Sequence, residues 1–297
     1  MKAIAKQISE KISNHYSAGE VAAITRTIAT ELLGIPQSTV FLKDDVTLTK
    51  EQATLLDNAI SRLAQHEPIQ YILGYSDFCG LRFAVTPATL IPRPETSELV
   101  EWITADTAGS ASILDIGTGS GCIAISLASK LKGATVTAWD ISSEALAIVQ
   151  HNNRSNGTGV TFSRVDILNY TPQGEQFDII VSNPPYIKEL EKAEMEPNVL
   201  NWEPHTALFV PDNDPLLFYR TIATKGLSML TPGGRLYFEI NRAHGEETTA
   251  MLRTLGYTGI ELRKDIAGND RMIKAIKNTP SACKQTAPET VEQYKRL

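Results

Sequence analysis

The stretch that decides the fold is Asp115-Ile116-Gly117-Thr118-Gly119-Ser120-Gly121-Cys122. It follows the first apolar strand pattern of an alternating region, and it opens a helix. Glycines at such a junction let the backbone turn tightly and approach a ligand closely, and the amino terminus of a helix favours partial negative charge. Open α/β folds bind their ligands at the carboxyl ends of their strands. The stretch therefore predicts an α/β sheet with a ligand site at this edge.

Strands and helices alternate on both sides of this stretch, which indicates a doubly wound sheet. A short link around Ala267–Asp270 joins the last two expected strands, and a link of this length cannot carry a parallel crossover. We therefore expect a Rossmann-like, seven-stranded, mostly parallel sheet with an antiparallel last strand. The expected strands are residues 111–117, 135–141, 160–166, 177–183, 233–240, 258–265 and 271–277.

The region before the sheet has a helical pattern. Apolar residues recur at helical spacing in residues 21–32 and again in residues 48–63. Between residues 71 and 95 we expect a hairpin whose first strand is the run Tyr71–Phe78 and whose turn is Cys79-Gly80. The expected domains are a helical, substrate-recognising bundle at residues 1–70, a hairpin and linker at 71–95, a catalytic domain at 96–277 and a polar tail at 278–297.

The composition argues against broad attachment to nucleic acid. Lys and Arg total 28 against 34 Asp and Glu, a net charge of −6, although a local basic patch is compatible with this balance. Residues 1–7 lack the apolar core of a signal peptide, and no apolar stretch is long enough to span a bilayer. Cys79, Cys122 and Cys283 are widely spaced and form no metal-ligand pattern. We expect a reduced, cytoplasmic protein without a metal site and without a membrane partner.

Polar residues at the strand ends suggest which cofactor binds. The loop reads Gly-x-Gly-x-Gly rather than the dinucleotide fingerprint, and Asp115 suits a cationic amino group better than a pyrophosphate. Asp140 is placed to accept from two ribose hydroxyls, while Asp166 could accept from an adenine amine with Ile167 against the ring. One glycine loop is weak support, and an acid after a strand is often a helix cap. Four successive strand ends with a suitable group favour S-adenosylmethionine.

Asn183-Pro184-Pro185-Tyr186 follows the strand expected at residues 177–183. Residues that precede a proline are pushed into extended conformations, and the prolines contribute no N–H donor. The side-chain carbonyl of Asn183 and the backbone carbonyl of Pro184 can therefore accept from one planar –NH2 group, with Tyr186 as a stacking face. This corner predicts a cradle for an amide or an exocyclic amine, although a lone Asn-Pro-Pro is usually a turn.

With these motifs the chain resembles the peptide chain release factor glutamine methyltransferases, the HemK/PrmC family, from about residue 68 to 277. Its expected sheet has the usual form of the class I S-adenosylmethionine-dependent methyltransferase fold. Asn-Pro-Pro-Tyr is shared with amino-methylating DNA and RNA enzymes, whereas Arg93–Thr96 and the helical amino-terminal module resemble this family specifically. The motifs that carry the resemblance are Pro68–Gly74, Ile91–Thr96, Asp115–Gly121, Val181–Ile187, Glu203–Phe209 and Gly268–Arg271.

The resemblance implies methyl transfer from S-adenosylmethionine to the side-chain amide of the glutamine in the Gly-Gly-Gln motif of release factors. Together with the strand-end argument, the expected cofactor-binding residues are Asp115, Gly117, Thr118, Gly119, Ser120, Gly121, Asp140, Asp166, Ile167 and Asn183. The expected substrate-binding residues are Asn183, Pro184, Pro185, Tyr186, Arg93 and Glu95, of which Asn183, Pro184 and Tyr186 are expected to be catalytic.

Arg93 and Glu95 have two interpretations, a salt-bridged helix start or a role in shaping the substrate mouth. The chain also departs from the family pattern, because Ser97 stands where an acid commonly follows and Pro215 replaces a glycine.

Two other functions are compatible with these residues. A nucleic-acid methyltransferase would hold a flipped adenine or guanine in the same cradle, and would need a basic groove or a target-reading domain. A non-catalytic protein would bind the cofactor or a release factor without chemistry.

Overall fold

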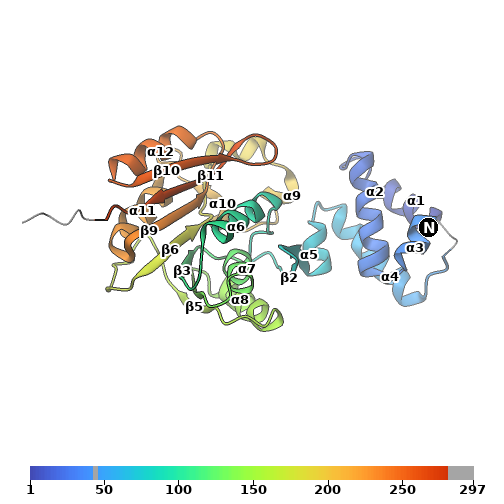
Figure 1. Cartoon of the computed structure of the whole chain (residues 1–297). Coiled ribbons are helices and arrows are strands. Elements are labelled where there is room, and N and C mark those ends of the chain that lie inside the picture. Colours follow the sequence, from blue (N-terminus) through green and yellow to red (C-terminus); the bar gives the residue numbers. More distant parts are fainter. Residues whose placement is uncertain (43–45, 280–297) are drawn as a thin grey trace, which may run out of the picture.

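The computed structural model describes residues 1–42 and 46–279. A helical bundle lies at one end of the molecule and an α/β sheet at the other, with a small hairpin between them (Figure 1). Most of the polar tail predicted at 278–297 lies outside the described residues. No helix of the described ranges is long and apolar enough to cross a membrane.

The amino-terminal bundle is helical, as predicted. Capping boxes begin two of its helices, Ser17 with Glu20 and Thr49 with Gln52, and these side chains satisfy backbone N–H groups that a helix start leaves free. The pattern of residues 21–32 ends in a π-helical turn rather than an α-helical one. Its elements are α1 (Lys2–Ile12), α2 (Ala18–Thr27), the π-helix η1 (Ile28–Leu32), α3 (Gln37–Leu42) and α4 (Lys50–Leu63).

The hairpin is shorter than predicted. β1 (Tyr75–Phe78) pairs antiparallel with β2 (Leu81–Ala84) around the expected Cys79-Gly80 turn. The prediction that Tyr71–Phe78 forms one strand is wrong, because α5 (Ile69–Leu73) occupies its first half. Gly74 ends this helix at φ 80°, a left-handed conformation that glycine adopts without steric cost.

The seven-stranded sheet has the order β10-β11-β9-β6-β3-β4-β5. All seven predicted strands are present, and β11 runs antiparallel to both of its neighbours, which confirms the predicted antiparallel last strand. The strands are β3 (Ser112–Ile116), β4 (Thr135–Asp140), β5 (Thr161–Arg164), β6 (Phe177–Ser182), β9 (Leu230–Glu239), β10 (Thr258–Lys264) and β11 (Asp270–Ile276).

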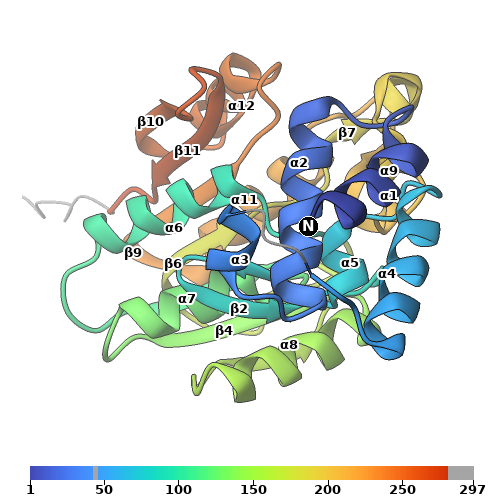
Figure 2. The same cartoon turned by 90° about the vertical axis from the view of Figure 1, so that its right-hand side faces the viewer.

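Helices cover both faces of the sheet, so the central strands read as continuous apolar runs. One buried cluster joins the sheet to α6 (Pro94–Asp106) and α7 (Cys122–Lys130), and the other joins it to α11 (Leu217–Met229). Viewed from the bundle, α12 (Gly245–Thr254) and α8 (Ser143–Ser155) lie at opposite ends of the sheet (Figure 2).

An excursion between β6 and α11 returns to the carboxyl edge of the sheet and completes the wall of a pocket there. The side chain of Trp202 in this excursion donates to the carbonyl of Gln65 at the end of the bundle, at 3.0 Å. The excursion comprises β7 (Ile187–Lys188), the 3-10 helix η2 (Glu189–Glu194), α9 (Pro197–Leu200), α10 (His205–Leu208) and β8 (Phe209–Val210), and β7 pairs parallel with β8.

Candidate active site

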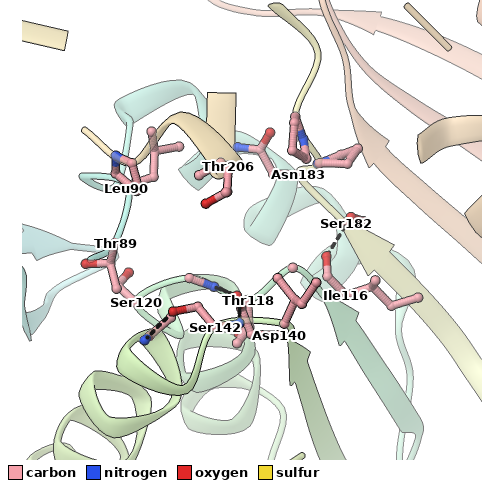
Figure 3. A pocket seen from close by; sticks show the side chains of 18 of the residues that line it. Thr89, Leu90, Ile116, Thr118, Ser120, Asp140, Ser142, Ser182, Asn183 and Thr206 are labelled. Atoms are coloured by element: carbon pink, nitrogen blue, oxygen red, sulfur yellow. Dashed lines mark hydrogen bonds between the residues drawn. The ribbon is translucent and has the colours of Figure 1, made fainter. Parts of the chain in front are cut away.

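A pocket of about 390 Å³ lies at the carboxyl ends of β3, β4 and β6. This is the edge at which an open α/β sheet binds its ligands. Asn183, Thr206 and Leu90 lie along one side of it, and Thr118, Asp140 and Ser142 along the other (Figure 3). Its walls come mainly from residues 88–93, 116–120, 140–142, 165–168 and 182–185 and from the excursion between Pro204 and Phe209.

The three loop glycines have left-handed backbones but not the same surroundings. Gly117 (φ 74°) and Gly119 (φ 57°) line the pocket, and a Cβ added to either would meet no described atom within 4 Å. A Cβ on Gly121 would meet Ile125 at 2.9 Å and Val149 at 3.3 Å. Gly121 therefore lets the chain pack tightly behind the loop, and it is not among the described residues that line the pocket.

Asp140 ends β4 and lines the pocket. Its Oδ2 accepts from the Gly119 N–H at 2.8 Å and its Oδ1 from the Ser142 N–H at 2.9 Å. Burial raises the pKa of Asp140, and these N–H donors act in the opposite direction. Each oxygen keeps a second lone pair, so the carboxylate can accept from two neighbouring hydroxyls.

Asp115 lies behind the pocket rather than in its lining. Its Oδ2 accepts from the Thr118 hydroxyl at 2.6 Å and from the Ala124 N–H at 3.2 Å, whereas its buried Oδ1 has no partner in the described part of the chain. Burial raises the pKa of Asp115 to about 7. A buried acceptor without a donor is costly, and a bound amino group or a water beside it would remove that cost. Ser120, which lines the pocket, has a similarly unpartnered buried hydroxyl.

Asp166 and Ile167 both line the pocket. The Asp166 carboxylate caps its own turn, because it accepts from the Leu168 N–H at 3.0 Å and from the Asn169 side chain at 2.7 Å. Ile141 and Leu168 also line the pocket and were missed in the sequence. Ile141 is 51% exposed there, which is unusual for an isoleucine. Apolar residues next to an expected ligand-binding acid are the signal that could have identified them.

These residues fit S-adenosylmethionine. A glycine loop leaves open space, an acid can accept from a ribose, and apolar side chains can face a flat ring. The unpartnered Oδ1 of Asp115 is suited to the amino group of the methionine part. Within the described residues, no group of three or more His, Cys, Asp or Glu side chains could hold a metal ion.

The Asn-Pro-Pro corner enters the same pocket. Asn183, Pro184 and Pro185 all line it, and the Asn183 side chain has no hydrogen-bond partner among residues 1–42 and 46–279. The Pro184 carbonyl is likewise without a donor within those ranges. Both acceptors that the sequence indicates are therefore without a donor within the described ranges, and the Asn183 side chain lies across the pocket from Thr118 of the glycine loop (Figure 3).

Tyr186 lies behind this corner and is not among the described lining residues. Its N–H donates to the Leu208 carbonyl and its carbonyl accepts from the Asn241 side chain, each at 3.2 Å. Burial raises the pKa of the Tyr186 hydroxyl well above its ordinary value. Tyr186 packs against the second core cluster, which favours a role in supporting the corner over the expected role as a stacking face.

The structure separates Arg93 from Glu95. Arg93 lines the pocket, and its Nη2 lies 2.6 Å from Oε1 of Glu203, whose side chain is buried. Glu95 is not among the described residues that line the pocket. The salt bridge at this helix start therefore reaches across to the excursion, and it holds the guanidinium at the pocket wall.

Two protein families match this chain. The PrmC N-terminal domain family matches residues 4–74, and the methyltransferase small domain family matches residues 95–200. Among solved structures, a methyltransferase from Pyrococcus furiosus aligns with 75% of this chain and 99% of its own at 18% identity, with a TM-score of 0.49.

Two curated relatives match nearly the whole chain. A release factor glutamine methyltransferase of Bacteroides thetaiotaomicron is 49% identical over 276 residues, covering 93% of this chain and 99% of that protein. One of Flavobacterium psychrophilum is 45% identical over 273 residues, covering 90% of this chain and 96% of that protein. By this identity over nearly its whole length, the chain belongs to the release factor glutamine methyltransferase family.

Proposed function

We propose that this protein transfers a methyl group from S-adenosylmethionine to the side-chain amide nitrogen of the glutamine in the Gly-Gly-Gln motif of peptide chain release factors. One observation carries the proposal. Asn183 and Pro184, whose carbonyls are the expected acceptors, line a single pocket together with the glycine loop and Asp140. The names of the relatives that match nearly the whole chain support the same substrate.

On this proposal the cofactor residues have separate tasks. Gly117 and Gly119 leave room for the cofactor, and Asp140 accepts hydrogen bonds from the cofactor's ribose. The Asp115 carboxylate binds the amino group of the methionine part, directly or through water. Ile141, Ile167 and Leu168 would enclose the adenine. S-adenosylmethionine, when bound, supplies an electrophilic methyl group on a positively charged sulfur.

The chain's own residues then orient and activate a weak nucleophile, the amide nitrogen of the substrate glutamine. An amide nitrogen attacks poorly because its lone pair is delocalised into the carbonyl. Asn183 and Pro184 accept from its two hydrogens, which orients the nitrogen and increases its electron density. Positioning of this kind can supply ~7–11 kcal/mol of the barrier. Methylation of the neutral amide nitrogen would give a positively charged, N-protonated amide, which is very acidic, so its extra proton can leave to water without a strong base.

We also propose that the helical bundle, residues 1–70, contacts the release factor. It is a separate hydrophobic unit with its own buried cluster, and its end is joined to the pocket wall through Trp202. A module in this position can bind parts of a protein substrate that lie away from the glutamine.

Labelled methyl transfer tests the substrate class. Purified release factor, duplex DNA and ribosomal RNA would each be incubated with the enzyme and methyl-labelled cofactor. We expect label on the release factor and none on either nucleic acid. Label on DNA or RNA, with none on the release factor, would show that the cradle holds a base instead.

A further inference from the structure

Glu239 is a buried acid at the carboxyl edge of the sheet that the proposed mechanism does not use. It ends β9, which is the neighbour of β6, and the register pairs Phe238 with Ser182. Glu239 therefore comes level with Asn183, the first residue of the corner. It is 2% exposed, and acids are seldom so deeply buried without a specific partner.

The partner of Glu239 is a residue of α6 that lines the pocket, whereas Glu239 itself is not among the described lining residues. The hydroxyl of Thr96 donates to its Oε2 at 2.6 Å, and Thr96 is also buried. Thr96 belongs to the first turn of α6 and lines the pocket, three residues after Arg93. This hydrogen bond therefore joins the end of β9, beside the Asn-Pro-Pro corner, to the first turn of α6. The same turn follows Arg93 at the pocket wall.

The exit of the same strand also holds the corner. Asn241 donates from Nδ2 to the Tyr186 carbonyl at 3.2 Å, while its Oδ1 accepts from the Ala243 N–H at 3.0 Å. The backbone N–H of Asn241 donates to the buried Tyr219 hydroxyl at 3.2 Å. Asn241 is therefore fixed on two sides and is itself positioned to fix the backbone of Tyr186.

The surroundings of Glu239 make its hydrogen bond important. Burial raises the pKa of Glu239 to about 7, and the Thr96 hydrogen bond and the positive charges of Arg271 and Arg93 oppose this rise, while Glu95 adds to it. Arg271 is itself paired with Asp265 at 3.1 Å. Removing the Thr96 hydroxyl would leave a buried carboxyl oxygen without its donor, which is costly.

We propose that Glu239 and Asn241 are positioning residues for methyl transfer. Glu239 holds the α6 wall through Thr96, and Asn241 holds the corner through the Tyr186 carbonyl. The inference rests on the proposed function, because the distance between these walls matters for a substrate amide that must lie between them. A displacement of about 1 Å at a reacting group can cost about 100-fold in rate.

Three threonine variants of the full chain test the Glu239 half. Thr96→Val keeps the shape and removes the hydroxyl, while Thr96→Ser restores it. Thr104→Val is the matched control, because it removes a threonine hydroxyl bound to the Val100 carbonyl on the same helix. The readouts are kcat and KM with a synthetic Gly-Gly-Gln peptide, the cofactor Kd by equilibrium titration, and the Tm.

We expect Thr96→Val to lower kcat/KM for the peptide at least about 10-fold, a modest part of what misplacement can cost. The cofactor Kd should stay unchanged, Thr96→Ser should recover most of the activity, and Thr104→Val should match the unsubstituted enzyme. The inference is overturned if Thr96→Val is fully active, or if its cofactor Kd worsens in step with its activity; a lower Tm alone is expected from the lost hydrogen bond.

Asn241→Asp tests the other half. Aspartate still accepts from the Ala243 N–H but turns an oxygen toward the Tyr186 carbonyl. We expect the same loss of peptide turnover with an unchanged cofactor Kd, and full activity of this variant would refute the role of Asn241. If the unsubstituted enzyme methylates no Gly-Gly-Gln peptide, the proposed function fails first, and this result is distinct from either failure above.

Discussion

Asn183 is the residue whose substitution separates binding of the cofactor from chemistry. Its side chain enters the pocket without a protein partner among the described residues, so its removal should disturb little else. We expect Asn183→Ala to lower turnover ~10²–10³-fold, as the loss of one preorganised hydrogen-bonding group does elsewhere. Single-turnover kinetics with a peptide substrate and equilibrium titration of the cofactor would measure both effects. A cofactor Kd that rises as steeply as turnover falls would refute the amide-cradle role.

Gly119 allows a second test with a matched control. Gly119→Ala should strain a backbone at φ 57° and place a methyl group in the pocket, so both Tm and cofactor affinity should fall. Gly157 has φ 64° and open space around it but is not among the described lining residues, so Gly157→Ala should lower Tm alone. Calorimetry and cofactor titration of both variants would check this. Equal cofactor affinities in the two variants would show that the glycine loop does not contact the cofactor.

Asp115 predicts a pH dependence of stability. Its folded pKa of about 7 lies above the ordinary value, so the folded state holds this proton more tightly than the unfolded state does. The contribution of Asp115 to the free energy of unfolding should therefore fall as pH rises from about 4 through about 7, and it should level off about one pH unit higher. Asn cannot titrate. The free energy of unfolding of Asp115→Asn should therefore rise relative to that of the unsubstituted protein over the same pH range, by on the order of 2–4 kcal/mol. Denaturant titrations at several pH values would show it, and parallel curves for the two proteins would contradict it.

At the scale of elements, the two edges of the sheet have different tasks. Asp178 lies near the amino end of β6, where it accepts from the Ser112 N–H of β3 at 2.9 Å and from the Thr231 hydroxyl of β9 at 3.1 Å. Asp178→Ala should cost ~1–3 kcal/mol of stability because it frees both donors. The ligand edge is at the other end of the strands, so the cofactor Kd should not change.

Urea denaturation and cofactor titration of Asp178→Ala would test that separation. Asp178→Asn keeps one acceptor and should lose less stability. The division of tasks would be wrong if Asp178→Ala weakened cofactor binding while leaving stability unaltered.

The strands of the sheet could be predicted because each one is a short apolar run between turn residues. Their buried faces leave little room for polar side chains, so Asp140 and Asn183 mark strand ends clearly. α5 could not be predicted in this way, since Tyr71–Leu73 is equally compatible with a strand and its helical state depends on the packing of Tyr71 and the cap at Gly74. Local pattern alone does not encode that packing.

The site was predicted less completely than the fold, for a related reason. Residues adjacent to a strand end, such as Asn183, are visible in the sequence. Glu203 pairs with Arg93 across 110 residues and Thr96 with Glu239 across 143, and only the fold brings such pairs together. The run Leu236–Glu239 has the same apolar-then-polar form as the other strands, so Glu239 could have been identified at the sheet edge, although its partner could not.

At the scale of the whole molecule, the bundle and the catalytic domain form separate cores that meet at few points. Tyr75 of the hairpin donates to Glu31 of the bundle, and Arg82 lies 3.5 Å from the same carboxylate. Trp202 adds the contact to Gln65. Damage to the bundle core should therefore leave the pocket largely intact.

Leu56→Ala tests the proposed role of the bundle. Leu56 is buried in the bundle core, and its truncation should cost about 2–5 kcal/mol there. We expect methylation of a whole release factor to fall while methylation of a short Gly-Gly-Gln peptide is retained. Leu252→Ala, in the catalytic core, is the matched control and should not alter the ratio between the two substrates. A constant ratio in Leu56→Ala would exclude the bundle from substrate contact.

The central claim is that the acceptor of the methyl group is a glutamine amide. Mass spectrometry of a release factor after incubation with the unsubstituted enzyme and S-adenosylmethionine tests it most directly, with Asn183→Ala enzyme as the control. We predict a gain of one methyl group, located by fragmentation on the glutamine of Gly-Gly-Gln, and its near absence with the variant. An unmodified glutamine, or a methyl group on any other residue, would contradict the claim.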